Sequence, residues 1–214
     1  MFSEVLSSNA KKLMQDILPQ EDTIREKFYL AGGTGLALHL GHRKSEDLDF
    51  ICKDVFPLNP IARLIDHLDG QLLVEEKDTV HAIINDVKIS FLWYPYEMLS
   101  PFDNYGKIRV AGVDDIACMK CIAISQRGAK KDYYDLYEIL RLYSLRKMRD
   151  MLEEKYGLNN VNIYHIGKSL LYFDEAEKTP EPVIFRNLKW EEVKTSIQSF
   201  SDEITQVFLE DSRQ

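Results

Sequence analysis

The residues best suited to chemistry are two carboxylates, Asp47 and Asp49, which are separated by one apolar residue. In a β-strand, residues two positions apart lie on the same face, about 7 Å apart along the strand. Two carboxylates at this spacing can jointly hold a hard divalent cation such as Mg²⁺. We therefore predict that Asp47 and Asp49 are metal ligands and take part in catalysis.

A glycine turn precedes these acids. An apolar segment over 28–31, typical of a short buried strand, leads into Gly32 and Gly33, where the backbone can turn sharply and approach a bulky group. Thr34 follows as a cap or first-turn residue of a predicted helix. Because a helix N-terminus offers free N–H groups and the positive end of the helix dipole, we expect Gly32, Gly33 and Thr34 to bind phosphate.

The order of strand, Gly-Gly-Thr turn, helix and Asp-x-Asp strand resembles the signature of the polymerase-β-like nucleotidyltransferases. The segment His42 to Phe50 more closely resembles the AbiEii/AbiGii toxin family, the nucleotidyltransferase half of certain bacterial toxin–antitoxin and phage-defence pairs. The resemblance extends over about residues 28–194. The plainer alternative is an acidic surface strand after a glycine turn.

The resemblance implies nucleotide-binding roles for Arg43 and Ser45, which lie just before the acids. It also implies that Lys120, borne on a helix, and Asp132, at the start of the next helix, are catalytic, and that Arg127 between them binds the nucleotide. Simpler roles stay open. Arg43 can belong to a surface loop, Ser45 can bond a backbone group in its own turn, Arg127 can belong to an ordinary basic helix start, and Asp132 can cap a helix.

One position departs from the family pattern. In polymerase-β-like enzymes a strand adjoining the Asp-x-Asp strand usually supplies a third carboxylate, here expected after a lysine and any one residue. This chain has Lys88-Ile89-Ser90. Lys88 is implied to bind the nucleotide, or is only a solvated charge, whereas Ser90 is a neutral and poor ligand for magnesium. Either Asp132 completes the site, or the protein binds a single metal–nucleotide and turns over slowly.

The resemblance thus implies transfer of a nucleoside monophosphate from a nucleoside triphosphate, with Mg²⁺ or Mn²⁺ as cofactor. The expected acceptor is tRNA, and the expected protein partner is an antitoxin encoded nearby. Two alternatives remain: a transferase of the same fold that modifies a small molecule or a protein hydroxyl, and a catalytically degenerate nucleotide-binding or partner-binding module. The serine at position 90 keeps the second alternative open.

Composition is that of an ordinary globular protein, with 214 residues, 45% hydrophobic and 29% charged. The apolar runs are strand-length, and the start lacks a basic segment followed by an apolar one, so we expect a cytoplasmic protein without a membrane partner. The net charge of −8 disfavours broad binding to duplex nucleic acid but allows an RNA held by a local basic patch. Cys118 and Cys121 are expected to be buried thiols, since no further zinc ligands accompany them.

We predict an α+β fold: a polymerase-β-like nucleotidyltransferase core, a mixed sheet with flanking helices, over residues 1–112, and an α-helical C-terminal domain over 113–214. The pattern predicts helices over 3–18, from 34 on, over 58–68, over 114–125 with Asp114 as N-cap, and from 141 on. It predicts strands over 28–31, 47–52, 71–75, 80–84, 87–93 and 107–110, with a tight turn at Asn85-Asp86 and a loop over 94–106.

Overall fold

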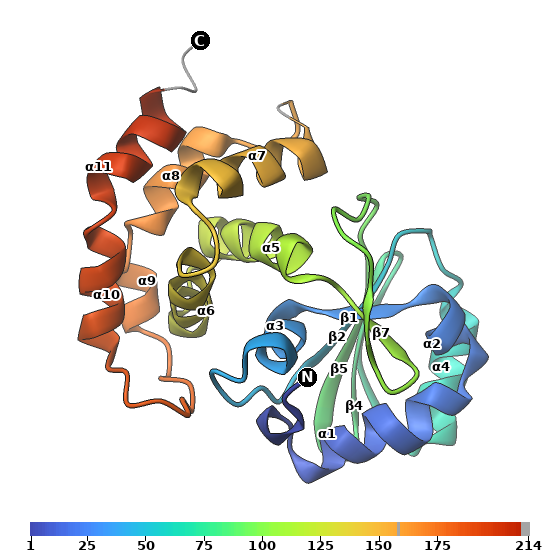
Figure 1. Ribbon diagram of the computed structural model, residues 1–214. Helices are drawn as coiled ribbons and strands as arrows, with labels where there is room; N and C mark the ends of the chain where they lie inside the picture. The colour runs from blue at the N-terminus through green and yellow to red at the C-terminus, as the bar shows by residue number, and fades with distance from the viewer. Residues whose placement is uncertain (158, 211–214) are drawn as a thin grey trace. The chain divides into compact units, whose positions relative to one another are not determined.

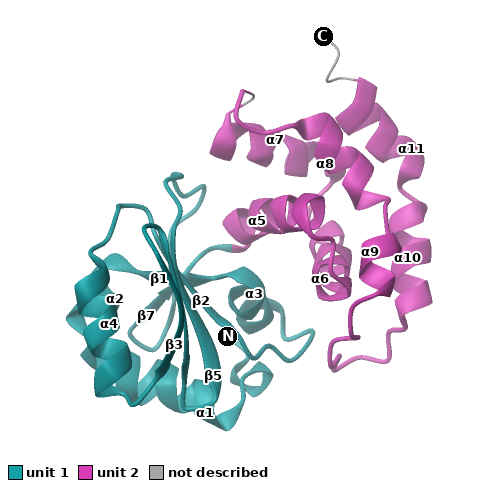
Figure 2. Ribbon diagram, turned by 180° about the vertical axis from the view of Figure 1, so that it is seen from behind, with its two compact units in different colours: residues 1–112 teal, residues 113–214 magenta. Residues whose placement is uncertain are grey.

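The computed structural model describes residues 1–157 and 159–210, and it divides the chain into two compact units, Met1–Gly112 and Val113–Gln214 (Figure 2). Unit 1 combines a sheet with helices, and unit 2 is built from helices. Across the described residues, no helix is both long and apolar enough to cross a membrane.

Unit 1 contains a seven-stranded sheet in the order β3-β4-β5-β2-β1-β7-β6 (Figure 1). The pairs β2–β5 and β1–β7 are parallel and the other pairs are antiparallel. The strands are β1 (Tyr29–Ala31), β2 (Leu48–Cys52), β3 (Gln71–Glu76), β4 (Thr79–Ile84), β5 (Val87–Trp93), β6 (Asp103–Tyr105) and β7 (Ile108–Val110). This mixed sheet with flanking helices confirms the predicted fold class.

The helices of unit 1 lie on both sides of the sheet, with α2 and α4 on one side and α3 on the other (Figure 1). They are α1 (Ser8–Lys12), α2 (Asp22–Lys27), α3 (Gly32–Leu40) and α4 (Leu58–His67), with short turns η1 (Ser3–Val5), η2 (Leu13–Ile17) and η3 (Leu18–Gln20). Alternate residues of β2, Leu48 and Phe50, belong to the buried core together with Ile61 and Ile65 of α4. Asp49, between them, therefore faces the other side of the sheet.

The N-terminal segment is not the single helix predicted over 3–18. Leu6 is extended, and the Ser7 side chain accepts a hydrogen bond from the backbone N–H of Ala10, so that a new helix begins at Ser8. The apolar pattern still marks the buried residues, among them Val5, Leu13 and Met14.

Two turns in unit 1 had different outcomes. The predicted turn at Asn85-Asp86 is confirmed, since both residues have positive φ and join β4 to β5 directly. The predicted loop over 94–106 was wrong at its end, where β6 pairs with β7 around Gly106. A three-residue strand beside prolines has too little alternation to be recognised from the pattern.

Unit 2 is helical, with a longer irregular connection before α10. Its helices are α5 (Val113–Gln126), α6 (Lys130–Leu140), α7 (Leu145–Tyr156), α8 (Ile163–Leu170), α9 (Asp174–Glu177), α10 (Trp190–Gln198), α11 (Ser201–Ile204) and η4 (Thr205–Glu210). Tyr133 and Phe173 both pack on Trp190, with ring centroids 6.0 Å from it. Asp114 is not the predicted N-cap, because α5 already begins at Val113; its carboxylate accepts a hydrogen bond from the Tyr143 hydroxyl instead.

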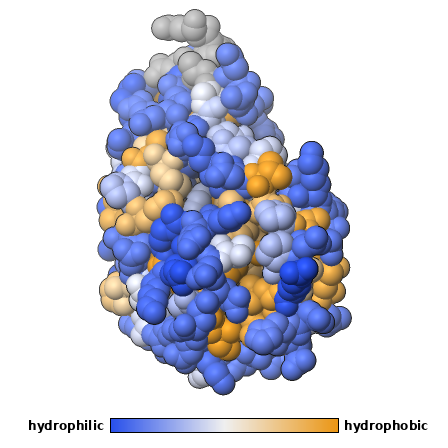
Figure 3. All heavy atoms as spheres, turned by 90° about the vertical axis from the view of Figure 1, so that its right-hand side faces the viewer, coloured by the Kyte–Doolittle hydropathy of each residue, from blue (hydrophilic) through white to orange (hydrophobic). Residues whose placement is uncertain are grey.

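One sheet edge carries a run of exposed apolar side chains. On the face drawn in Figure 3, hydrophobic residues form separate groups among hydrophilic ones, which is normal for a globular surface. The edge strand β3 is exposed along its whole length, including the consecutive residues Leu72, Leu73 and Val74.

Candidate active site

The Asp49 carboxylate packs closely against Gly32. Asp49 lies on β2 opposite Ala31, the last residue of β1, and Gly32 follows Ala31 as the first residue of α3. A Cβ atom at Gly32 would lie 2.3 Å from Oδ2 of Asp49, and Gly32 has φ +62°. Glycine is thus needed here both for its backbone conformation and for the space that the carboxylate occupies.

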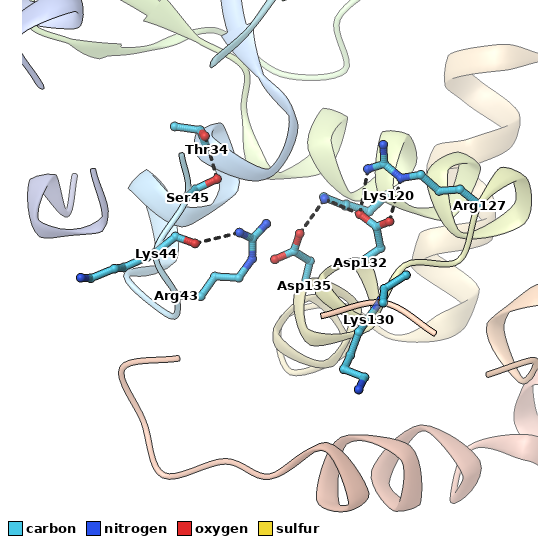
Figure 4. Close-up of polar contacts among 10 residues, drawn as sticks. Thr34, Arg43, Lys44, Ser45, Lys120, Arg127, Lys130, Asp132 and Asp135 are labelled. Atoms are coloured by element: carbon cyan, nitrogen blue, oxygen red, sulfur yellow. Dashed lines mark hydrogen bonds and ion pairs between the residues drawn. The ribbon is translucent and has the colours of Figure 1, made fainter. Parts of the chain in front are cut away.

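The loop before β2 is fastened to α3 by hydroxyl groups. The Thr34 hydroxyl donates to the backbone carbonyl of Asp47, and the hydroxyl oxygens of Thr34 and Ser45 are 2.7 Å apart (Figure 4). Both side chains are buried. β2 begins at Leu48, so the alternation argument covers Asp49, while Asp47 is positioned by this loop instead.

The other predicted nucleotide-binding residues of unit 1 differ in exposure. Arg43 is buried, and its guanidinium donates to the backbone carbonyl of Lys44 over 2.9 Å. Gly33 lies in the first turn of α3, and Lys88 is exposed on β5. The β1–α3–β2 segment therefore brings together the glycine turn, Arg43, Ser45 and the two acids, and Lys88 comes from the strand next to β2.

Ser90 stands directly beside Asp49, because β2 and β5 pair in parallel with these two residues in register. This is the adjoining-strand position where a third acid was expected. The Ser90 side chain is buried, and its oxygen lies 3.0 Å from Nδ1 of His81, its register partner on β4. Sequence reasoning missed His81, although the Asn85-Asp86 turn that it predicted pairs residue 81 with residue 90.

The donor atoms of this site fit magnesium only in part. Asp47 and Asp49 are half-buried and offer hard oxygen ligands, and Mg²⁺ is commonly held by one or two carboxylates together with substrate phosphates. Within the described part of the chain, no three or more His, Cys, Asp or Glu residues gather closely enough to hold a metal ion. The two carboxylates therefore suit a cation that arrives with a nucleotide.

Unit 2 holds the second group of predicted residues. The Lys120 ammonium lies 2.8 Å from Oδ1 of Asp132 and 2.6 Å from Oδ2 of Asp135 (Figure 4). Nε of Arg127 lies 3.0 Å from Oδ2 of Asp132. Asp132 is in the first turn of α6 and is not its N-cap, which is Ala129. Asp135 was not among the residues predicted for the site.

Burial and charge act in opposite directions on Asp132. Burial raises the pKa of its carboxyl group. The Lys120 ammonium and the hydrogen-bonded Arg127 guanidinium together lower this pKa by more than burial raises it, so that the net pKa lies below its usual value. The Asp132 and Asp135 side chains are 0% exposed, whereas the Arg127 side chain is 58% exposed. This cluster is a charged network fixed inside unit 2, with only the arginine at the surface.

The Cys-x-x-Cys pair on α5 is buried and free, as expected. Burial raises the pKa of the Cys121 thiol to about 12, so that this group stays protonated at neutral pH.

The glycine turn at a helix N-terminus lies beside an acidic strand in a mixed sheet, which is the arrangement that the motifs predicted for a nucleotidyltransferase core. A family model described as "Nucleotidyl transferase AbiEii toxin, Type IV TA system" matches residues 16–97 and 86–208. The chain belongs to this AbiEii family of nucleotidyltransferase toxins, which confirms the resemblance noted from the motifs.

The chain is also similar to one uncharacterized protein and to two solved structures. The chain is 40% identical over 179 residues to the uncharacterized protein aq_aa25 of Aquifex aeolicus (strain VF5), covering 78% of this chain and 82% of that one. MenT4, nucleotidyltransferase toxin Rv2826c from Mycobacterium tuberculosis H37Rv, aligns with a TM-score of 0.60 at 13% identity, over 95% of this chain and 84% of that one. JHP933 from Helicobacter pylori aligns with a TM-score of 0.56 at 17% identity, over 97% of each chain. These two structures share the fold.

Proposed function

We propose that this toxin-family nucleotidyltransferase transfers a nucleoside monophosphate from a nucleoside triphosphate to the acceptor end of tRNA. The observation that carries the proposal is the Asp49 carboxylate packed over Gly32 at the N-terminus of α3. This contact places a carboxylate that can bind a cation beside backbone N–H groups that suit phosphate. This pairing is what a metal–triphosphate complex requires.

In the proposed reaction, an acceptor hydroxyl oxygen forms a bond to the α-phosphorus, and the bond from that phosphorus to pyrophosphate breaks. Asp47 and Asp49 would hold Mg²⁺ or Mn²⁺, which neutralises phosphate charge when bound. The turn Gly32–Thr34 receives the phosphates, and the side chains of Arg43 and Lys88 add positive charge near them. Ser45 acts by fastening the loop to Thr34, as their 2.7 Å contact indicates.

The charged cluster of unit 2, formed by Lys120, Arg127, Asp132 and Asp135, has a supporting role in the same proposal. Asp132 holds the buried Lys120 and the exposed Arg127 through its two oxygens, and Arg127 supplies positive charge for the acceptor. Arg127 is the member best suited to touch a ligand, because its side chain is more than half exposed while its guanidinium is held by Asp132.

The RNA acceptor, the antitoxin and a cytoplasmic location belong to the proposal as well. A net charge of −8 requires that any RNA contact be local. Unit 2 offers exposed basic side chains at Arg141, Arg146 and Lys147, around the start of α7, which supports an RNA-binding role for that surface. Family membership supports an antitoxin partner.

The test incubates the purified protein with Mg²⁺, total RNA and each labelled nucleoside triphosphate in turn, with Asp49→Ala as the inactive control. The expected result is label on tRNA with one preferred nucleotide, lost on chelation of the metal and in Asp49→Ala. Label on protein or on a small molecule instead would replace tRNA as the acceptor. No transfer to any acceptor would overturn the proposed function.

A further inference from the structure

The missing third acid is replaced by a bonded pair, Ser90 and His81. Asp49, Ser90 and His81 occupy one row across three neighbouring strands, β2, β5 and β4, as their registers show. In-register residues of neighbouring strands point to the same face, so all three side chains lie on the face away from Leu48 and Phe50.

The chemistry of this row bears on a step that every nucleotidyl transfer contains. The acceptor hydroxyl must lose its proton as its oxygen attacks phosphorus, and a carboxylate beside the metal ligands is one group that can receive it. Serine cannot keep an added proton at neutral pH. Histidine can, since its ordinary pKa of about 6.5 lies close to neutrality.

We propose that His81 receives the proton of the acceptor hydroxyl through Ser90, an inference that rests on the proposed function. The acceptor oxygen binds the α-phosphorus, and the bond to pyrophosphate breaks. The acceptor proton passes to the Ser90 oxygen while the proton of Ser90 passes to Nδ1 of His81, 3.0 Å away. The imidazolium then releases a proton to water, since the His81 side chain is only half-buried.

Other charged groups lie on the same face of the sheet as His81. By register these are Asp49 on β2, Lys88 beside Ser90 on β5, and Glu76 on β3, opposite Thr79. Among them, Asp49 is committed to the cation in the proposed function, and Lys88 is a cation itself. His81 is the group with a hydrogen bond to Ser90, which makes it a positioning residue that acts through the serine.

The experiment measures kcat and the KM for nucleoside triphosphate in four proteins: the unaltered chain, His81→Asn, Ser90→Ala and the double variant. Asparagine can still bond to Ser90 but cannot take up a proton. Each single variant is expected to lose about 10²-fold in kcat with little change in KM, and the double variant is expected to lose no more than either. The matched control is His67→Asn on α4, an exposed histidine outside the row.

Ser90→Asp distinguishes proton uptake by His81 from a merely structural role of that residue. A carboxylate at this position can take the proton directly, so His81→Asn is expected to lose less than about 3-fold in kcat in this background. Melting temperatures are measured for every variant. An unchanged kcat in His81→Asn, or the same loss with and without Ser90→Asp, would overturn the inference. The proposed function is judged separately, by transfer in the unaltered chain and its loss in Asp49→Ala.

Discussion

Two pairs of aspartates lie in opposite surroundings in this protein. In unit 1, Asp47 and Asp49 are half-buried and stand beside a glycine turn and a helix N-terminus. In unit 2, Asp132 and Asp135 are fully buried and both bind the ammonium of Lys120. The first pair is half-exposed to solvent, whereas the second is enclosed together with the ammonium of Lys120.

The difference shows what each pair can do. A buried carboxylate is stable only when a cation and hydrogen bonds compensate its lost hydration, and Lys120 and Arg127 provide these in unit 2. A metal ion at Asp132 would have to displace one of them. A half-buried carboxylate such as Asp49 has no such requirement. The unit 1 pair is thus suited to metal binding, and the unit 2 pair to holding basic side chains in place.

The largest expected effect is on activity, at Asp49. Asp49→Ala is expected to lower the rate of nucleotide transfer about 10³-fold. The cation loses a ligand, and a cation that is no longer held cannot neutralise the charge of the phosphates. The melting temperature should stay close to that of the unaltered protein, because removing a half-exposed carboxylate leaves no buried group unpaired. Labelled-nucleotide transfer and thermal unfolding measure the two quantities.

Asp66→Ala, an exposed aspartate on α4, is the matched control for that variant and should change neither quantity. If Asp49→Ala kept normal turnover, the open pair of carboxylates would not be the metal site.

The next effect is on stability, at Lys120. Lys120→Met keeps the length of the side chain but removes the ammonium that contacts both Asp132 and Asp135 inside unit 2, which should lower the free energy of unfolding by about 3–5 kcal/mol. Denaturant unfolding checks this value. Lys147→Met, at an exposed position on α7, should change it by about 0.5 kcal/mol or less.

A compensating variant makes this test sharper. Combining Lys120→Met with Asp132→Asn and Asp135→Asn removes the carboxylate charges that the ammonium compensated and should recover part of the lost stability. If Lys120→Met alone were as stable as the unaltered protein, the cluster of unit 2 would not be held by charge.

A third effect concerns the space beneath Asp49. The added methyl group of Gly32→Ala would lie 2.3 Å from the Asp49 carboxylate and must displace it, so transfer should fall about 10²-fold. Gly106→Ala is a close control, because Gly106 has φ +60° and a Cβ there would meet nothing within 4 Å. Both variants should lose about 1 kcal/mol of stability from backbone strain, and only Gly32→Ala should lose activity. Equal activities would show that the carboxylate need not occupy this position.

The parts of the site that the sequence predicted are those encoded locally. The Gly32-Gly33 turn and the strand of Asp49 follow each other along the chain, and their order alone predicts a strand, a helix and a second strand. The strand that carries Ser90 was predicted from its apolar alternation, and its register with Asp49 places the serine where the pattern expected an acid.

The parts that it did not predict depend on packing between distant segments. Asp135 meets Lys120 only because α5 packs on α6, and nothing near either residue signals that contact. The bond between His81 and Ser90 requires the pairing of two strands to be traced residue by residue from their turn. The break at Ser7 shows a local competitor, because a serine cap can restart a helix inside an unbroken apolar pattern.

The smallest expected effect is on the pH dependence of stability, at Asp132 of the buried pair. The folded-state pKa of Asp132 lies below its ordinary value, chiefly because the pull of Lys120 and Arg127 outweighs burial. Its charge therefore stabilises the folded protein above the unfolded pKa of about 3.9, and this contribution disappears as the pH falls through the lower folded pKa.

Asp132→Asn cannot titrate, so the unaltered protein should be the more stable of the two at pH 7, with the difference in unfolding free energy shrinking below about pH 4. Asp66→Asn, at an exposed position, is the surface control. Denaturant unfolding from pH 7 to pH 3 measures both series. A constant gap between the unaltered protein and Asp132→Asn would mean that the carboxylate is not held charged by its two cations, and the contrast between the buried and the open pair would then fail.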